Sequence, residues 1–426
     1  GAKSRAGVFV GLILIFTLAV PMAAAEREAV TLQFWNGWGG TRIPLMEQML
    51  ERFMQKYPWI QVENQVIGLG NDRIEKLTLA VAAGAPPDVA MIDRVDIPAF
   101  VAEGMLEPLD PFIARDRLDL GIFYEPEISL AQFEGRTWAL PIPTAGAKQL
   151  MFYHMDLFRE AGLDPAAPPR TWTELEAAAR KLTIRQGDGL VQAGINPLSV
   201  SDASWDFWLY NNNGAVLSPD GRRVAFDDAR GRQTMRWLVD FHQRINGGSA
   251  MLATLGGGFI QRKLAMQIAG SWEWYNFRRQ DPSLELAIAL PPHGEGATSV
   301  NPISRGWGYA IPAGADHPYE SWLLIKYLTT EPEAACWFMI QQGRPSPLKQ
   351  CNLAPEMRQS NPYLDVIGEI LVHGVQVPIT PVHTRFFELV ARAQADAISG
   401  RLAPDAAIES AAREAQALLD EAYGLR

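Results

Sequence analysis

Residues 135–183 read GRTWALPIPTAGAKQLMFYHMDLFREAGLDPAAPPRTWTELEAAARKLT, and this stretch decides how the chain folds. WALPIP at 138–143 predicts a short strand at the edge of a sheet, because proline cannot donate a ladder hydrogen bond. TAG at 144–146 is expected to be a flexible joint. LMFY at 150–153 is an apolar run that predicts a buried strand.

Two helices follow these strands. The first is expected over 155–161, where Gly162 supplies the residue that commonly ends a helix. Thr171 is expected to cap the second helix, with Glu174 completing a capping box. Upstream, strands expected over 30–34, 60–67 and 88–92 alternate with helical segments, which predicts an α/β lobe with a mainly parallel sheet.

The segment 135–183 resembles the pattern N-K-D-L-F-x-x-A-G-L-x-P…T-W-x-E-L…A-x-K-L of the family 1 extracellular solute-binding proteins, which are sugar-capturing subunits of ABC importers. His154 and Met155 stand where the family has Asn and Lys. Other segments with family patterns follow in the same order: AAGAPPDVAMID at 82–93, FIQRKLAMQIAGSWEW at 259–274, GWGYAIP at 306–312 and SWLLIKYLTTEPEAACWFMIQQGRPSP at 321–347.

The resemblance implies a two-lobed periplasmic binding protein fold of type II, in the α/β class. Each lobe is expected to be a mainly parallel sheet flanked by helices, and the chain is expected to be interleaved between them. The N-terminal lobe takes 29–143 and 307–343, and the C-terminal lobe takes 147–301 and 347–426. Hinge crossings are expected near 143–148, 301–306 and 343–346.

The N-terminal residues predict export. Lys3 and Arg5 precede an apolar run over 7–20, and Ala23-Ala24-Ala25 offers a cleavage site, so residues 1–25 are expected to be a cleavable signal peptide. The next residue is Glu26 and not the Cys that a lipoprotein requires. We therefore expect a periplasmic, monomeric protein that is not a lipoprotein and has no stable membrane insertion after cleavage.

Composition narrows the partners and the chemistry. The net charge of −10 becomes −12 without the two cations of the leader, which argues against nucleic acid as a partner. The only cysteines, Cys336 and Cys351, either form a disulfide in an oxidising compartment or remain free thiols. We find no motif typical of a catalytic site, and none for a metal or a cofactor. A glycosidase carboxylate pair stays open, because nothing selects one pair.

Ligand contacts are expected where tryptophan occurs beside polar side chains, because a sugar offers both apolar faces and hydroxyl groups. Residues that follow parallel strands or precede lobe crossings are further candidates. For each tryptophan the alternative is a core residue, and for each arginine a hinge salt bridge. The candidates are Trp35, Asn36, Trp38, Asp93, Arg94, Trp205, Asp206, Trp272, Glu273, Trp274, Arg305, Gly306, Trp307, Arg344 and Ser346. The glycines on both sides of Trp307 are expected to let the backbone approach a ligand.

The first functional hypothesis is a substrate-binding protein that closes around a carbohydrate and delivers it to ABC importer permease subunits, without catalysis. A second keeps the fold and binds glycerol 3-phosphate or another phosphorylated polyol, for which Lys148, Arg94, Arg305 and Arg344 supply positive charge. A third is a secreted glycosidase or lyase. The first hypothesis expects a site neutral enough for an uncharged sugar, with Asp93, Asp206 and Glu273 offsetting Arg94, Arg305 and Arg344.

Overall fold

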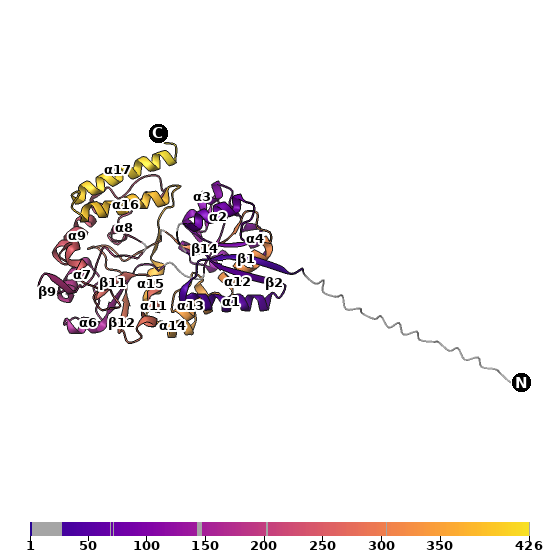
Figure 1. Cartoon of the computed structure of the whole chain (residues 1–426), viewed down its shortest axis with the longest axis horizontal. Helices are drawn as coiled ribbons and strands as arrows, with labels where there is room; N and C mark the ends of the chain where they lie inside the picture. The colour runs from indigo at the N-terminus through magenta and orange to yellow at the C-terminus, as the bar shows by residue number, and fades with distance from the viewer. Residues whose placement is uncertain are drawn as a thin grey trace.

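The computed structural model describes residues 1, 28–68, 70, 72–142, 147–201, 203–303 and 305–425. Figure 1 shows two lobes side by side, and segments from both halves of the chain contribute to each lobe. The chain is therefore interleaved, as predicted. The predicted signal peptide lies outside the described residues apart from Gly1, and so does most of the first crossing, 143–146.

The first lobe is built on a six-stranded sheet with the order β2-β1-β3-β14-β4, in which β7 also pairs with β14. β1 runs parallel to β2 and β3, whereas β14 runs antiparallel to β3, β4 and β7. Pro141 lies in β7, which pairs with β14 beside the main path of the sheet, and this confirms the predicted proline-bearing edge strand. The strands are β1 (Val30–Asn36), β2 (Ile60–Val66), β3 (Val89–Asp93), β4 (Leu106–Glu107), β7 (Leu140–Pro141) and β14 (Trp307–Pro312).

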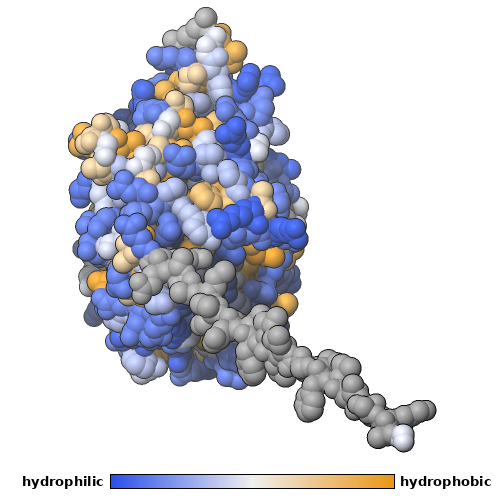
Figure 2. Space-filling model, turned by 90° about the vertical axis from the view of Figure 1, so that its right-hand side faces the viewer, coloured by the Kyte–Doolittle hydropathy of each residue, from blue (hydrophilic) through white to orange (hydrophobic). Residues whose placement is uncertain are grey.

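Helices cover this sheet and close the first apolar core. Leu32 and Phe34 of β1 alternate inward and pack with Phe53 and Trp322 in one fully buried cluster. The face of this lobe seen in Figure 2 is covered mostly by hydrophilic residues, with smaller hydrophobic groups between them. The helices are α1 (Ile43–Lys56), α2 (Asp72–Ala82), α3 (Ile97–Ala102), α4 (Asp110–Asp116), α5 (Glu125–Ser129), α12 (Pro318–Thr330), α13 (Ala335–Gln342) and α14 (Pro355–Ser360).

The second lobe surrounds a three-stranded sheet with the order β11-β8-β12, formed by β11 (Met266–Ala269), β8 (Leu150–His154) and β12 (Leu286–Ala289). All five residues of β8 are buried, which confirms the strand predicted from LMFY. Thr171 and Glu174 form the predicted capping box. The helices are α6 (Met155–Glu160), α7 (Trp172–Leu182), α8 (Trp205–Tyr210), α9 (Ala229–Arg244), α10 (Gly248–Ala253), α11 (Glu273–Gln280), α15 (Leu364–Val372), α16 (His383–Ile398) and α17 (Pro404–Ala422).

The prediction of a mainly parallel sheet in each lobe is wrong for the second lobe. Both pairings in the β11-β8-β12 sheet are antiparallel. The antiparallel pairing follows from where β8 begins. The chain arrives from the first lobe at the first residue of this strand. Leu150, its first residue, pairs with Ala269, the last residue of β11. A strand that begins at the boundary between the lobes must run opposite to strands that end there.

Two short strands pair at the boundary between the lobes. β13 (Asn301–Ile303) pairs in parallel with β15 (Gly374–Gln376), at the crossing predicted over 301–306. We call this pair the hinge ladder. The hydroxyl of Ser129, in the first lobe, donates to Gln376 at 3.0 Å. The hinge ladder therefore contacts the first lobe directly.

The third crossing differs from the prediction. Leu348, Cys351 and Met357 belong to the first lobe's core, although 347–426 was assigned to the second lobe. The chain joins the second lobe's core only at α15, through Ile367 and Ile370. The disulfide between Cys336 and Cys351 ties this excursion to α13. Of the two alternatives that the sequence left open for these cysteines, the structure has the disulfide, and it lies within one lobe.

We predict that replacing both cysteines with serine destabilises the first lobe by roughly 3 kcal/mol, the chain-entropy value for a loop of this length. The bridged residues are 15 positions apart. Denaturant unfolding of the double variant and of the oxidised protein measures the difference. Unchanged stability in the variant would show that the bridge does not constrain the unfolded chain.

Candidate functional site

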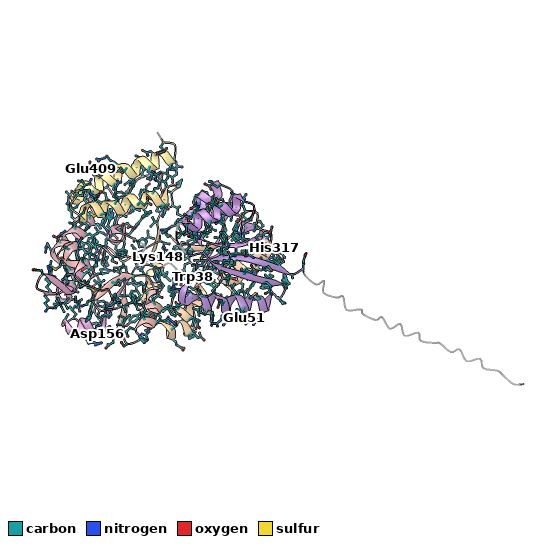
Figure 3. The ribbon with its side chains drawn as sticks, in the orientation of Figure 1. Trp38, Glu51, Lys148, Asp156, His317 and Glu409 are labelled. Carbon is teal, nitrogen blue, oxygen red and sulfur yellow. A yellow bond between two sulfur atoms is a disulfide. The ribbon has the colours of Figure 1, made fainter. Side chains whose placement is uncertain are left out.

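The two sheets meet end to end at the lobe boundary. β1 ends at Asn36, β3 ends at Asp93, and β14 begins at Trp307, which pairs with Asp93. In the second lobe β11 ends one residue before Gly270. Figure 3 places Trp38 and Lys148 in the middle of the molecule, between the lobes. Ligands of α/β proteins bind beyond the carboxyl ends of strands, and these loops occupy that position.

The first charged group at this boundary is centred on Asp93, whose side chain is 1% exposed. Its carboxylate accepts from the Nε of Arg305 at 2.9 Å and from the backbone N–H of Gly306 at 3.4 Å. Arg73 lies 3.4 Å from Asp96, and its guanidinium is centred 4.6 Å from the ring of Trp307. We call Arg73, Asp93, Asp96, Arg305 and Trp307 the Asp93 cluster.

The charges of the Asp93 cluster compensate one another. Burial raises the pKa of Asp96 to about 6, the charge of Asp93 adds to this effect, and Arg73 opposes it. His383, at the start of α16 in the second lobe, has its pKa lowered to about 4 by burial, while Asp93 acts in the opposite direction. A neutral imidazole therefore faces this cluster across the lobe boundary at neutral pH.

Arg94 has a structural role. Its side chain and that of Glu127 are each 1% exposed and form an ion pair of 2.8 Å. Arg94 also donates to the backbone carbonyl of Glu127. Both residues belong to the first lobe, so Arg94 forms a buried salt bridge within that lobe instead of the hinge salt bridge or the ligand contact that the sequence left open.

The glycines beside Trp307 accommodate protein atoms. A Cβ added to Gly306 would lie 1.9 Å from a terminal nitrogen of Arg94. A Cβ added to Gly308 would lie 3.0 Å from Ala139 and 3.1 Å from the carbonyl of Leu140. Both glycines were expected to make room for a ligand. In the structure they make room for Arg94 and for the residues at β7.

A second group lies nearby and contains two arginines. Arg344 is 4% exposed, and its guanidinium is centred 5.8 Å from the ring of Trp38 and 5.5 Å from the ring of Trp272. The guanidinium of Arg42 is centred 5.3 Å from the same Trp38 ring. The Oε1 of Gln342 accepts from Arg42 Nε at 2.9 Å and from Arg344 at 3.5 Å. We call Trp38, Arg42, Trp272, Gln342 and Arg344 the arginine cluster.

Both lobes build the arginine cluster. Trp38 lies in the loop after β1, whereas Trp272 lies between β11 and α11. A Cβ added to Gly270 would lie 2.2 Å from the indole of Trp272, so this glycine lets the ring lie flat on the backbone. Trp272 donates to Glu273 at 3.1 Å.

Asn36 supports the loop that carries Trp38. It is fully buried, and its Oδ1 accepts from the backbone N–H of Trp38 at 3.2 Å. Its amide nitrogen has no hydrogen-bond partner among the residues that the structure describes. Asn36 therefore fixes the loop and keeps a donor available at the lobe boundary.

The structure places the remaining candidates in packing or turn positions. Trp205 is fully buried in the second lobe and donates to the carbonyl of Val390 at 2.9 Å. Asp206 accepts from the backbone and hydroxyl of Ser204. Neither belongs to the two clusters, and burial of Trp205 does not fit a ligand contact. Burial also raises the pKa of Asp206.

Trp274 and Ser346 are also held by protein atoms. The indole of Trp274 donates to the carbonyl of Ser360 at 3.2 Å. The hydroxyl of Ser346 accepts from the backbone of Leu348 at 3.1 Å. Trp35 is half-buried and packs against the first core. We leave these three residues and Trp205 out of the proposed site.

Four residues that sequence reasoning did not select are part of these clusters. Arg42 follows β1, Arg73 follows β2, Asp96 follows β3, and Gln342 ends α13. The first three could have been selected by the rule that chose Asn36, because they too come after the carboxyl ends of parallel strands. Gln342 carries no such signal, since only tertiary packing brings the end of α13 to the boundary.

The three carboxylates and three arginines that were expected to neutralise one another do not all lie in one site. Arg94 is paired with Glu127, and Asp206 lies with Ser204 in the second lobe. Arg42 and Arg344 have no carboxylate within 4.0 Å among the residues that the structure describes. Positive charge is therefore concentrated in the arginine cluster.

The described part of the chain contains no group of three side chains arranged to hold a metal ion. Within the same ranges, no helix has the length and apolar character that a membrane span requires.

Comparisons with known proteins match this chain to binding proteins. The family model "Bacterial extracellular solute-binding protein" matches residues 39–335. A putative binding protein of Brucella abortus is 23% identical over 98% of both chains. The arabinooligosaccharide-binding protein of Bacillus subtilis is 24% identical, and the match covers 68% of this chain and 67% of that protein. A solute-binding protein of an ABC transporter from Thermotoga lettingae, solved with α-D-tagatose, has 25% identity and a TM-score of 0.74, covering 92% of this chain and 100% of its own.

We predict that Gly306→Ala destabilises the protein by about 1–3 kcal/mol, because the added methyl group overlaps Arg94 and disturbs its buried ion pair. Gly368→Ala is the control, since no heavy atom lies within 4 Å of the added Cβ and the residue is inside α15. The control should be stabilised by roughly 0.5–1 kcal/mol. Thermal and denaturant unfolding measure both variants. Equal effects in the two would refute the packing explanation.

Proposed function

Because this chain belongs to the bacterial extracellular solute-binding protein family, we propose that it is the periplasmic substrate-binding subunit of an ABC importer and captures a carbohydrate between its lobes. It performs no catalysis, and it delivers the sugar to membrane permease subunits. One observation supports a carbohydrate as the ligand. Trp38 from one lobe and Trp272 from the other both lie next to the guanidinium of Arg344. Flat rings suit the apolar faces of a sugar, and guanidinium groups suit its oxygen atoms.

The fold supports capture by closure. The hinge ladder and the segment before α15 connect lobes that otherwise have separate apolar cores. Periplasmic binding proteins close around their ligands by rotation about a few connecting residues, and this chain has the matching arrangement. A ligand touching both lobes favours the closed form, because the open form offers it only one side.

A thermal-shift screen of mono- and oligosaccharides tests the proposal. The expected result is a rise in melting temperature with at least one sugar, confirmed by calorimetry. An assay for released reducing sugar runs beside the screen, since a secreted glycosidase or lyase would consume the sugar. Binding only to glycerol 3-phosphate and related polyol phosphates would replace the carbohydrate with the phosphorylated alternative.

We predict that Trp307→Ala weakens carbohydrate binding by about 1–3 kcal/mol, the scale for losing a buried aromatic contact. Trp307 is half-buried on the first core, below Arg73, so stability also falls. Trp337→Ala is the matched control, because this tryptophan is half-buried on the same core with Arg52 centred 4.2 Å from its ring. Calorimetry and thermal unfolding of both variants separate the two effects.

The control should lose a similar amount of stability and keep its affinity. Equal affinity in the two variants would make Trp307 a packing residue and remove it from the site.

A further inference from the structure

The arginine cluster holds positive charge that the protein does not compensate. Arg344 is nine-tenths buried or more, and among the described residues no carboxylate lies within 4.0 Å of its guanidinium. Its contact with Gln342 is long, at 3.5 Å, and Gln342 is neutral. Burying a charge without a counter-ion costs far more than burying a paired one. The buried positive charge of the arginine cluster therefore lacks a counter-ion.

Each of the other buried or half-buried arginines discussed at the boundary has a carboxylate as counter-ion. Arg94 has Glu127 at 2.8 Å and Arg305 has Asp93 at 2.9 Å. Arg73 has Asp96 at 3.4 Å. The lack of a carboxylate beside Arg344 and Arg42 among the described residues is thus specific to one place.

The aromatic rings do not replace the missing counter-ion. Trp38 and Trp272 lie 5.8 and 5.5 Å from the Arg344 guanidinium, toward the outer limit of a cation–π contact. Such contacts are weak compared with the desolvation of a buried guanidinium. Moreover, Arg42 faces the same Trp38 ring and brings a second positive charge, which lowers the pKa of Arg344 further after burial has lowered it.

The carboxylate of Glu273 acts on both arginines and raises the pKa of each, against the larger effect of burial. This carboxylate already accepts from the Trp272 indole at 3.1 Å and from the Asn276 amide at 3.4 Å. Two guanidinium groups and one carboxylate leave a single positive charge. That balance fits a ligand group with one negative charge, whereas a phosphate ester carries up to two.

We propose that the arginine cluster binds the carboxylate of an acidic sugar, with Trp38 and Trp272 against the ring of the same uronic acid residue. This inference rests on the proposed function and narrows its ligand to carbohydrates that contain a uronic acid. Arg344 and Arg42 donate to the carboxylate oxygens, and a planar guanidinium matches a carboxylate with two parallel hydrogen bonds. The Asp93 cluster, whose charges are paired, takes neutral hydroxyl groups of the ligand.

The test uses the full chain, freed of bound ligand by unfolding and refolding, and a panel of matched probes. The probes are galacturonate, glucuronate and their disaccharides, the neutral counterparts galactose, glucose and the corresponding neutral disaccharides, and galactose 6-phosphate and glucose 6-phosphate. Calorimetry should show that a uronate binds roughly 10- to 100-fold more tightly than its neutral counterpart, the range for a charged hydrogen bond. Arg344→Gln should weaken binding of the uronate by about this factor and binding of the neutral probe much less, so that the preference disappears.

Two further variants control the result. Arg344→Lys keeps the charge and should keep part of the preference. Arg52→Gln removes an arginine that lies over the distant Trp337 and should keep all of it.

A second readout needs no ligand. If Arg344 lacks a counter-ion in the empty protein, Arg344→Gln should raise the melting temperature, because an unpaired buried charge has been removed. A fall in that temperature would make Arg344 a structural residue and overturn the inference. Tighter binding of a neutral sugar or of a phosphate would also overturn it, while leaving carbohydrate capture or its phosphorylated alternative in place. Binding by no member of the panel would overturn the inference, whereas the proposed function fails only if the wider sugar screen also finds no ligand.

Discussion

The arrangement of the whole molecule depends on one pairing constraint: a strand that enters a lobe from the hinge must run against the strands that end at the hinge. β14 does so beside β3, and β8 does so between β11 and β12. Each entering strand is locked by backbone hydrogen bonds at the lobe boundary. As a result, the residues just before it are held in place although they belong to crossing segments. Trp307 and Arg305 owe their positions to this constraint.

The arginines near the lobe boundary differ in whether a carboxylate neutralises their buried charge. Arg94 and Glu127 are both nearly inaccessible and satisfy each other, and the absence of a side chain at Gly306 leaves room for that arginine. Removing either partner would leave a buried charge without compensation. Arg344 has the same burial without such a partner among the described residues. The same residue type thus serves structure in one place and, on the proposed assignment, recognition in the other.

The parts of this fold that could be predicted from sequence are those with local causes. The capping box at Thr171, the proline-bearing edge strand at 140–141 and the buried run of β8 each follow from a few neighbouring residues. The family resemblance added the two-lobed order. The direction of β8 and the return of 348–357 to the first core were missed, because both result from contacts between distant segments.

The site was predictable to a smaller extent for the same reason. Trp38, Trp272 and Arg344 were selected by composition and position, and the structure brings them together. Trp205 has equally polar neighbours in sequence, yet its helix turns it into the second core, where Val390 accepts its N–H. A polar sequence neighbourhood indicates solvent or ligand only when the backbone faces outward. All six residues of α8 are buried, because α9 and α16, which come later in the chain, pack on this helix.

On the proposed assignment, the arginine cluster also links recognition to closure. Arg344 lies where a tryptophan from each lobe comes close, so bringing the lobes together removes water from its guanidinium. Without an anion this desolvation opposes closure, and with an anion the new ion pair offsets it. A ligand shifts an equilibrium only by its difference in affinity for the two states, and here that difference includes the charge that the protein itself leaves unpaired. An empty protein would then resist adopting the closed form, so a permease that recognises closure would encounter mainly loaded molecules.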